Sequence, residues 1–239
     1  MLTSDALFDG RLTVCQEQKG YRFSLDAVLL AGLTHIRRDD RVIELGTGCG
    51  IISLILAYKD KTEHKITAVE IQPELAELAQ KNVCDNHFDH RIEVHRRDFR
   101  QAAPAGENFD LVLSNPPYRK PGTGRINPDK QKAIARHELT ATAADVFKAA
   151  QRLVPTGGRV ALVYPATRLA TLLGAAQGHG FSPKRLTVIH SRAHGPGRLV
   201  HLECRKGSGE GLTVEPPFFV YDEQGRYSPA MRELYRCAD

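Results

Sequence analysis

Between about residue 40 and residue 205, strand-like runs alternate with helix-like runs, and this alternation constrains the fold more than any other feature. The segments VIEL at 42–45 and LVLS at 111–114 have the continuous apolar character of strands that are covered on both faces. Between them, QPELAELAQKNVCDN at 72–86 places apolar residues at helical spacing. Because alternating strands and helices build βαβ units, the sequence predicts an α/β fold: a mostly parallel sheet with helices on both faces.

The boundaries of the expected elements follow from the apolar patterns and the glycine and proline punctuation between them. Expected strands cover 41–45, 65–70, 91–98, 109–114, 157–165, 184–191 and 198–207, and expected helices cover 50–59, 72–86, 138–154 and 166–180. Only RAHGPG separates the last two strands, which predicts an antiparallel pair. Residues 16–33 predict a turn and then a helix, with Ser24 as its N-cap. We expect one domain over 1–239, with N-terminal elements at 1–40, a core at 41–206 and a tail at 207–239.

Composition excludes several classes of protein. The five cysteines form no CxxC pair and predict no disulfide framework. The N-terminus lacks the basic and apolar regions of a secretory signal, and no apolar run approaches the roughly 18–20 residues that cross a bilayer. We therefore expect a cytoplasmic protein with no membrane contact, and the sequence indicates no obligate protein partner.

A glycine-rich loop, ELGTGCG at 44–50, follows the first core strand and opens a helix. Gly46, Gly48 and Gly50 permit a tight turn and let the backbone approach a ligand closely. The spacing differs from the dinucleotide fingerprint GxGxxG, and no Gly-Lys-Ser/Thr follows as in a phosphate-gripping loop. The loop therefore suits a ligand with a compact polar end rather than a pyrophosphate.

Acidic residues after the next two strands refine the ligand. Glu70 ends the strand after the glycine loop, where a carboxylate can accept hydrogen bonds from both hydroxyls of a ribose. Asp98 follows the third strand and can hold an adenine amino group, with the aromatic ring of Phe99 packed beside it. A ligand with a ribose and an adenine but no phosphate matches S-adenosylmethionine, which we expect as the cofactor.

The fourth core strand ends in Asn-Pro-Pro-Tyr at 115–118, beside the expected cofactor pocket. The prolines make the loop stiff and leave backbone carbonyls without an internal donor, while Asn115 adds a side-chain carbonyl. Two rigid acceptors can grip both hydrogens of a planar amine, and Tyr118 can stack on its plane. The motif therefore predicts methyl transfer to an –NH₂ group whose lone pair is delocalised.

Positive charge is concentrated in two stretches. From 119 to 136 there are six Lys/Arg and one acid, an excess that equals the net charge of +5 of the whole chain. A second basic stretch runs from 184 to 206. Clustered positive charge beside an active site favours a polyanionic partner such as nucleic acid.

Four segments together resemble the bacterial tRNA valine adenine N6-methyltransferases, which carry the Asn-Pro-Pro-Tyr motif. They are QEQKGYRFSLDAVLLAGL, ELGTGCGIISLILA, SNPPYRKPGTGRINPDKQKAIARHEL and VYDEQGRYSPAMRELY. The resemblance covers nearly the whole chain. It implies a Rossmann-like class I methyltransferase with a seven-stranded, mostly parallel sheet whose last strand is antiparallel. It also implies S-adenosylmethionine-dependent methylation of N6 of adenine 37 in the anticodon loop of tRNA valine.

The resemblance assigns roles to individual residues. Residues that would hold or border the cofactor are Tyr21, Arg22, Ser24, Asp26, Glu44, Gly46, Gly48, Cys49, Gly50, Glu70, Ile71, Asp98, Phe99 and Asn115. The catalytic group that would grip the adenine comprises Asn115, Pro116, Pro117 and Tyr118. From charge and position, the candidates for contacts with tRNA phosphates are Lys19, Arg119, Lys120, Arg125 and Arg136.

Other functions share the amine clamp. A glutamine methyltransferase of release factors uses the same motif on a side-chain amide, but such enzymes usually carry a helical N-terminal domain. A ribosomal-RNA guanine N2-methyltransferase is a second alternative, and a catalytically silent RNA-binding protein is a third. In CDNHFDH, Cys84, His87 and His90 lie close together, but we expect a solvated helix end there and no metal site.

Overall fold

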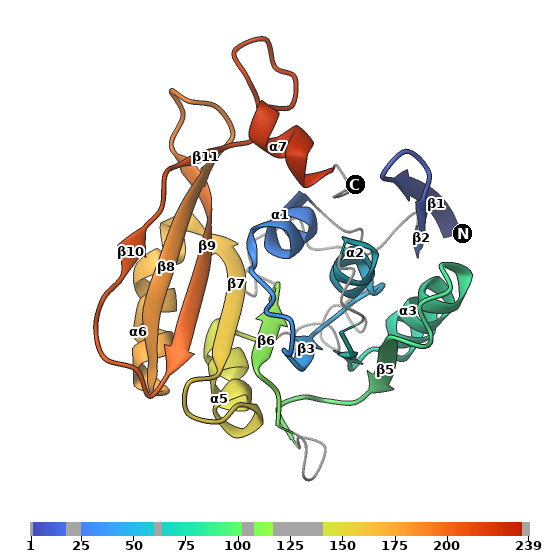
Figure 1. Ribbon diagram of the computed structural model, residues 1–239, viewed down its shortest axis with the longest axis horizontal. Helices are drawn as coiled ribbons and strands as arrows, with labels where there is room; N and C mark the ends of the chain where they lie inside the picture. The colour runs from blue at the N-terminus through green and yellow to red at the C-terminus, as the bar shows by residue number, and fades with distance from the viewer. Residues whose placement is uncertain (1, 18–24, 60–63, 102–107, 117–140, 236–239) are drawn as a thin grey trace, which may run out of the picture.

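The computed structural model describes residues 2–17, 25–59, 64–101, 108–116 and 141–235. Its centre is a twisted sheet with helices on both faces (Figure 1). The long strands are β3 (Val42–Leu45), β4 (Ile66–Glu70), β5 (Ile92–Arg96), β6 (Leu111–Ser114), β7 (Arg159–Pro165), β8 (Phe181–His190) and β9 (Gly197–Lys206). Their order across the sheet is β8-β9-β7-β6-β3-β4-β5, in which β9 alone is antiparallel to its neighbours. The predicted α/β fold and the antiparallel β8–β9 pair are confirmed.

Among the described residues, two further strands bring the sheet to nine, against the seven expected. β10 (Thr213–Val214) and β11 (Phe218–Phe219) pair in parallel with the outer edge of β8. With two residues each, they carry too little sequence to show an alternating pattern. They form because β8 offers an unpaired row of backbone groups.

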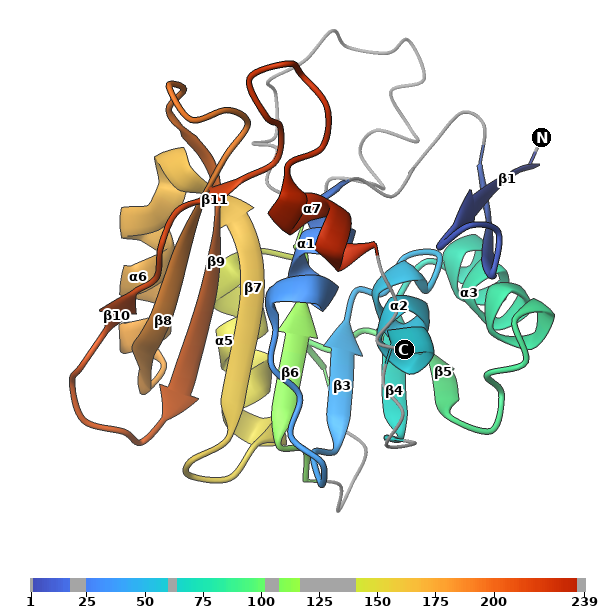
Figure 2. The ribbon, with the colours of Figure 1, turned by 45° about the horizontal axis from the view of Figure 1, so that its top comes forward.

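Two layers of helices cover the sheet (Figure 2). α1 (Leu25–Leu33), α2 (Ile51–Lys59) and α3 (Pro73–Asp85) share one apolar core with it. α5 (Ala143–Leu153) and α6 (Leu169–Gly178), the latter preceded by the 3₁₀ turn η1 (Ala166–Arg168), share a second core on the opposite face. All four residues of β3 and all four of β6 are buried, which is why these strands are mainly apolar, with Glu44 and Ser114 as buried polar exceptions.

The helix expected from residue 138 begins at Ala143 instead. Thr142 and Asp145 form a capping box: the Asp145 N–H donates to Thr142 Oγ1 at 3.2 Å, and the Thr142 N–H donates to Asp145 Oδ2 at 2.8 Å. These two bonds satisfy backbone donors that a helix start leaves open, so they set the boundary. Residues 138–140 lie outside the described part of the chain.

The N-terminal piece contains a hairpin that the sequence analysis did not predict. β1 (Leu2–Leu7) and β2 (Leu12–Glu17) pair antiparallel around a turn in which Asp9 (φ 57°) and Gly10 (φ 84°) take left-handed conformations. The Phe8 ring packs 4.8 Å from the ring of Tyr58 on α2. The expected helix follows as α1, but Ser24, its proposed N-cap, lies outside the described residues.

The tail returns to the α1–α2 face. Its helix α7 (Pro229–Leu234) is capped by Ser228, whose Oγ accepts from the Met231 N–H at 3.0 Å. Lys59 Nζ donates to the Leu234 carbonyl at 2.8 Å. A Cβ on Gly32 would lie 2.7 Å from Leu234 Cδ2, so this glycine lets α7 approach α1 closely. Within the described residues, no helix is both long and apolar enough to cross a membrane.

Candidate active site

The parallel register brings four strand ends to one edge of the sheet. Leu45 of β3 pairs with Val69 of β4, and Glu70 of β4 pairs with Arg96 of β5. On the other side of β3, β6 runs parallel in register. The glycine loop after β3, the acids after β4 and β5, and Asn-Pro after β6 therefore lie along one edge, the upper edge of the sheet in Figure 2. Ligands of open α/β sheets bind at this carboxyl edge.

The glycine loop has the conformation that its sequence requires. Gly46, Gly48 and Gly50 have φ of 77°, 59° and 86°, a region that disfavours any L side chain. A Cβ on Gly46 would meet nothing within 4 Å, whereas a Cβ on Gly50 would lie 3.3 Å from Ala79 Cβ on α3. Gly46 thus leaves open space at the carboxyl edge, and Gly50 lets the start of α2 pack against α3.

Glu70 holds the glycine loop from the neighbouring strand. Its Oε2 accepts from the Gly48 N–H at 2.9 Å, and its Oε1 accepts from the Gln72 N–H at 2.8 Å. From the sequence, Glu70 was expected to face a ribose, and its bond to the glycine loop was not expected. Because each carboxylate oxygen has two acceptor sites, the side chain can hold the loop and still accept from ribose hydroxyls.

Glu44 is a fully buried carboxyl group at the base of the loop. Its Oε2 accepts from Thr47 Oγ1 at 2.8 Å, from the Ser53 N–H at 3.0 Å and from the Ser53 hydroxyl. Its Oε1 has no donor within the described part of the chain. Burial raises the pKa of Glu44 to about 7. A buried acceptor without a partner fits a ligand that brings a cationic donor, as the amino group of S-adenosylmethionine would.

Asp98 is engaged by a neighbour in the described structure. Arg100 Nη2 lies 2.7 Å from Asp98 Oδ2, and the Arg100 N–H donates to Asp98 Oδ1 at 2.9 Å. Hydrogen bonds from Arg100 lower the pKa of Asp98, so the carboxylate is charged at neutral pH. Phe99 packs against the α5–α6 core, and Ile71 is half-buried after β4. Asp98 therefore follows β5 with its carboxylate oriented by Arg100, and its contact with an adenine amine stays a prediction.

Asn115 and Pro116 continue β6 directly to the carboxyl edge, where Asn115 is half-buried and Pro116 is buried. The residue before them, Ser114, donates through Oγ to the Leu45 carbonyl at 2.8 Å. Leu45 immediately precedes Gly46. The hydrogen bond therefore ties the start of the Asn-Pro-Pro-Tyr motif to the start of the glycine loop, and the sequence analysis did not single out Ser114.

The remaining predicted residues divide into two groups. Asp26 is half-buried in the first turn of α1. Cys49 is buried in the core, and burial raises the pKa of its thiol to about 12, so only its backbone is available to a ligand. The residues outside the described part of the chain are Lys19, Tyr21, Arg22, Ser24, Pro117, Tyr118, Arg119, Lys120, Arg125 and Arg136.

Asn82 is a residue that the sequence analysis missed. It is fully buried on α3, and its Nδ2 donates to the Cys49 carbonyl in the glycine loop and to the Cys15 carbonyl on β2, each at 2.9 Å. Its Oδ1 accepts from the Cys15 N–H at 2.8 Å. One amide thus joins the N-terminal hairpin, α3 and the glycine loop. The available signal was a polar residue at 82 inside the apolar stripe 75, 78, 79 and 83.

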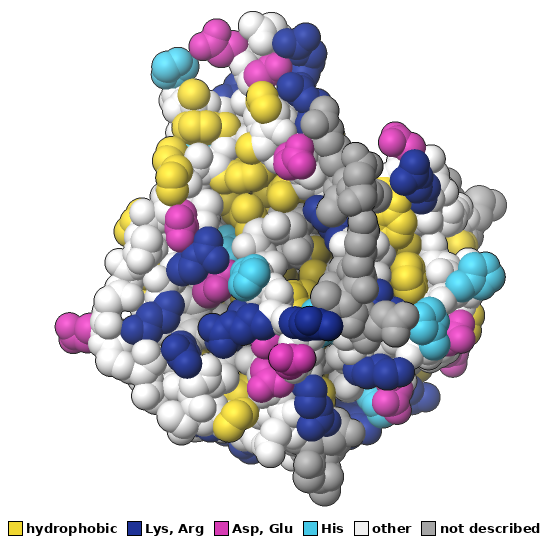
Figure 3. Space-filling model, viewed as in Figure 1, with side chains coloured by type: hydrophobic (Ala, Val, Ile, Leu, Met, Phe, Trp, Pro, Cys, Tyr) yellow, Lys and Arg dark blue, Asp and Glu magenta, His cyan; other side chains and the backbone are white. Residues whose placement is uncertain are grey.

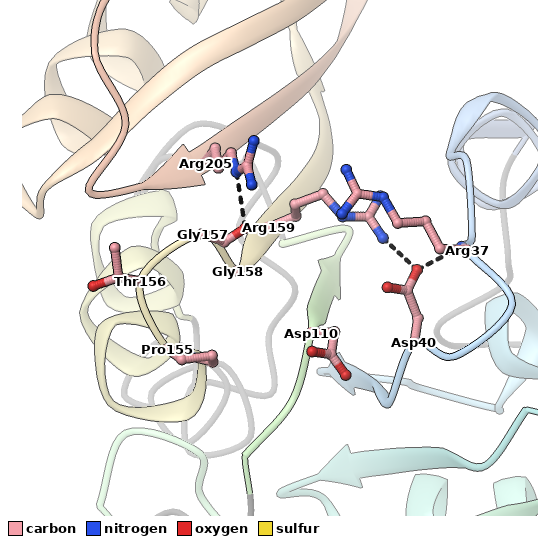
Figure 4. A pocket seen from close by; sticks show the side chains of 9 residues that line it. All are labelled: Arg37, Asp40, Asp110, Pro155, Thr156, Gly157, Gly158, Arg159 and Arg205. Atoms are coloured by element: carbon pink, nitrogen blue, oxygen red, sulfur yellow. Dashed lines mark hydrogen bonds and ion pairs between the residues drawn. The ribbon is translucent and has the colours of Figure 1, made fainter.

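A separate cavity of about 210 Å³ lies at the opposite edge of the sheet (Figure 4). Arg159, which begins β7, reaches across it to an ion pair with Asp40, and Arg205 Nε donates to the Gly157 carbonyl at 3.1 Å. Because these residues lie at the amino end of β7, the cavity is separate from the edge that carries Gly46 and Asn115. Among the described residues, which include Cys84, His87 and His90, no three or more His, Cys, Asp or Glu side chains gather as a metal site.

Comparison with known proteins gives consistent matches. Residues 24–171 match the methyltransferase small domain family. A tRNA1(Val) (adenine(37)-N6)-methyltransferase from a Flavobacteriaceae bacterium is 30% identical over 217 residues, which are 90% of this chain and 90% of that protein. The crystal structure of a predicted O-methyltransferase from Agrobacterium tumefaciens is 26% identical, with a TM-score of 0.71 over 90% of this chain and 98% of that one. A SAM-dependent O-methyltransferase from Thermotoga maritima shares the fold, with 18% identity and a TM-score of 0.56 over 80% of this chain and 68% of that one.

Proposed function

The chain belongs to the methyltransferase small domain family, and on that premise we propose that it methylates N6 of adenine 37 in a valine tRNA. It is an S-adenosylmethionine-dependent methyltransferase. The tRNA substrate is supported by the Flavobacteriaceae relative, which bears that activity in its name. The observation that carries the proposal is the position of Asn115 and Pro116. They directly follow Ser114, the last residue of β6, whose hydroxyl is bonded to the Leu45 carbonyl beside the glycine loop.

The carboxyl edge offers a donor and acceptor set that fits the cofactor. Glu70 would accept the ribose hydroxyls while it holds the Gly48 N–H, and Asp98 would accept the adenine amine. Glu44 would accept from the methionine amino group through the oxygen that has no donor in the described chain. The open space over Gly46 lets the ligand approach the backbone. When bound, S-adenosylmethionine supplies an electrophilic methyl group.

The target amine is activated by acceptors rather than by a base. The side-chain carbonyl of Asn115 and the backbone carbonyl of Pro116 would each accept one hydrogen of the adenine N6 amine. This increases electron density on nitrogen and favours the tetrahedral geometry of attack, which is stabilisation of the transition state by fixed dipoles. The bound cofactor would supply the methyl group and leave as its neutral thioether, and the methylated nitrogen, which is strongly acidic, would lose a proton to water. Holding the amine in line with the methyl group supplies much of the rate.

Recognition of the whole tRNA needs more than the clamp. The target base must leave the anticodon-loop stack to reach the carboxyl edge, and Tyr118 would stack on it there. Lys19, Arg119, Lys120, Arg125 and Arg136 would contact phosphates. We propose that the hairpin, core and tail act as one methyltransferase domain, because the hairpin packs on Tyr58 and the tail on Lys59. Because the proposed substrate is a tRNA, we also propose that the protein acts in the cytoplasm.

Methyl transfer from radiolabelled S-adenosylmethionine tests the proposal. The acceptors are unmodified tRNA valine, the same transcript with guanine at position 37, ribosomal RNA and a release factor. Label in the first tRNA alone, recovered as N6-methyladenosine after digestion, is the expected result. Label in the release factor or in ribosomal RNA would show that the proposed substrate is wrong, while the proposed cofactor site would still stand. Equal label in both tRNA transcripts would show that the methylated base is not the one at position 37.

A further inference from the structure

The structure divides the basic stretch 184–206 between two opposite edges of the sheet. β8 and β9 form an antiparallel hairpin in which Phe181 pairs with Lys206 at one end and His190 pairs with Gly197 at the other. The His190 end lies at the carboxyl edge, because β9 residue Leu199 pairs with Pro165 at the end of β7. In Figure 2 this turn rises above the upper edge of the sheet, on the same side as the ends of β3 and β6.

The cations at the amino edge are already engaged within the protein. Lys184 Nζ donates to the Gly209 carbonyl at 2.7 Å, and Lys206 Nζ donates to the Val154 carbonyl at 2.7 Å. Arg185 Nε is 2.8 Å from a Glu215 carboxylate oxygen. Arg205, as described above, donates to the backbone. Figure 3 shows Lys and Arg side chains gathered over the end of β9.

The cations at the carboxyl edge are different. Arg192 lies in the turn and Arg198 near the start of β9, and both side chains are exposed. No hydrogen bond or ion pair engages either guanidinium group in the structure of the described residues. In the neighbouring tail loop, the Asp222 carboxylate lies 3.2 Å from Arg226 Nε. This acid is therefore already paired with an arginine of its own loop. The turn thus presents two positive charges with no acceptor of their own.

The turn is also held in one conformation. The Gly195 N–H donates to the Arg192 carbonyl at 3.0 Å, and the Gly195 carbonyl lies 2.8 Å from His190 Nδ1. A Cβ on Gly197 would lie 2.5 Å from Val188 Cγ1, so the strands are packed closely there. Charges on a fixed turn bind an anion with less ordering entropy than charges on a mobile segment.

From this placement we propose that Arg192 and Arg198 bind backbone phosphates of the substrate RNA beside the target nucleotide, and that the amino-edge half of the stretch does not contact RNA. The inference rests on the proposed tRNA function and adds the surface that the RNA occupies. β9 is separated from β6 by β7 alone, which places it about 10 Å from β6 across the sheet. That spacing reaches the phosphates flanking a base held at Asn115.

Two double variants with equal charge change test the inference. Arg192→Ala/Arg198→Ala removes the carboxyl-edge charges, and Lys184→Ala/Arg205→Ala removes two charges from the amino edge. For each, binding of tRNA valine is measured between 50 and 200 mM salt by filter binding, together with kcat, KM and S-adenosylmethionine affinity. We expect the slope of log K against log salt to become shallower by about 1.4 for the first variant, because each lost contact with single-stranded RNA removes about 0.7. KM should rise while S-adenosylmethionine affinity is unchanged.

The control variant should retain the wild-type slope and KM. If the slope of log K against log salt became equally shallow in both variants, the inference would be overturned. The result would show that tRNA binding depends on the net charge of the protein and not on the position of these two arginines. A wild-type slope in Arg192→Ala/Arg198→Ala, while the wild-type enzyme methylates tRNA valine, would also overturn it and leave the proposed function intact. Wild-type protein that methylates only a release factor would instead refute the proposed function.

Discussion

The amide of Asn82 is expected to stabilise the fold and the cofactor loop together. Asn82→Ala removes the donors to the Cys49 and Cys15 carbonyls and the acceptor of the Cys15 N–H. The Cys49 carbonyl is inside the protein, where lost hydrogen bonds are not replaced readily by water. Cys15 lies on a half-buried strand, where water can compensate in part.

The magnitude follows from the three bonds. A typical intramolecular hydrogen bond contributes about 1 kcal/mol net, so the variant should lose about 3 kcal/mol of the free energy of unfolding. For a chain of 239 residues this corresponds to a decrease in Tm of roughly 6–12 °C. The glycine loop also loses the bond that fixes its Cys49 carbonyl, and we expect S-adenosylmethionine affinity to fall between about threefold and tenfold, up to about 1.4 kcal/mol.

Urea unfolding followed by circular dichroism measures the stability, and titration calorimetry measures the cofactor affinity. The matched control is Asn86→Ala, at the residue that caps the C-terminus of α3. Asn86 makes the same pair of bonds to Thr13, at 2.9 and 2.7 Å, but in an exposed position. Its Nδ2 also donates to the Asn82 backbone carbonyl at 2.7 Å, a bond that Asn82→Ala retains, and it has no bond to the glycine loop. It should lose less than about 1 kcal/mol and retain cofactor affinity.

Two results would refute this reasoning. If Asn82→Ala lost no more stability than Asn86→Ala, the buried amide would have no special energetic role. If Asn82→Ala lost about 3 kcal/mol but bound the cofactor normally, then the Cys49 carbonyl would be held by the rest of the loop, and the link to the site would be wrong.

Three further predictions concern the site itself. Asn115→Ala should abolish methyl transfer while cofactor affinity stays within about tenfold, because its bonds act in the transition state, and a large loss of affinity would reassign it to the pocket. Gly46→Ala should lose about 1–2 kcal/mol of stability from its φ of 77°, and an unchanged Tm would contradict that strain. The folded-state pKa of Glu44 is raised to about 7 from 4.5, which means that the folded protein favours the protonated carboxyl group. The contribution of Glu44 to the free energy of unfolding is therefore fully present below about pH 4.5 and is lost as pH rises through 7. Glu44→Gln should therefore flatten urea-measured stability between those pH values, and a persistent slope would assign the dependence to another group.

The core of the fold could be predicted because its strands are buried on both faces and are mainly apolar in sequence, with single buried polar residues such as Glu44 and Ser114. β3 and β6 are examples, and the glycine loop between β3 and α2 follows from its own local pattern. The hairpin β1–β2 also had a local signal in Asp9-Gly10 between two apolar-polar segments, and the sequence analysis did not use it. β10 and β11 had none, because their pairing depends on an edge that is distant in the chain.

The site shows the same division. The positions of Gly46, Glu70 and Asn115 along one edge follow from the order of the strands, which a βαβ pattern implies. The bond from Ser114 to Leu45 joins residues 69 apart in sequence, and nothing local predicts it. Asp98 pairs with Arg100, two residues away. Other arginines are equally near in the sequence, so the sequence alone does not show which of them pairs with Asp98.

The pairing of the tail with β8 has a consequence for association between molecules. β8 is a ten-residue edge strand, and without β10 and β11 its outer backbone groups would be a template for a strand from another copy. β10 occupies the edge at Arg185 and Leu186, and β11 occupies it at Ile189 and His190. The opposite edge strand, β5, carries Glu93, His95 and Arg96, whose polar side chains discourage pairing there. By pairing with β8, the tail therefore prevents this strand from pairing with a strand of another copy. One edge of the sheet is covered by β10 and β11, and the other edge, β5, carries charged side chains.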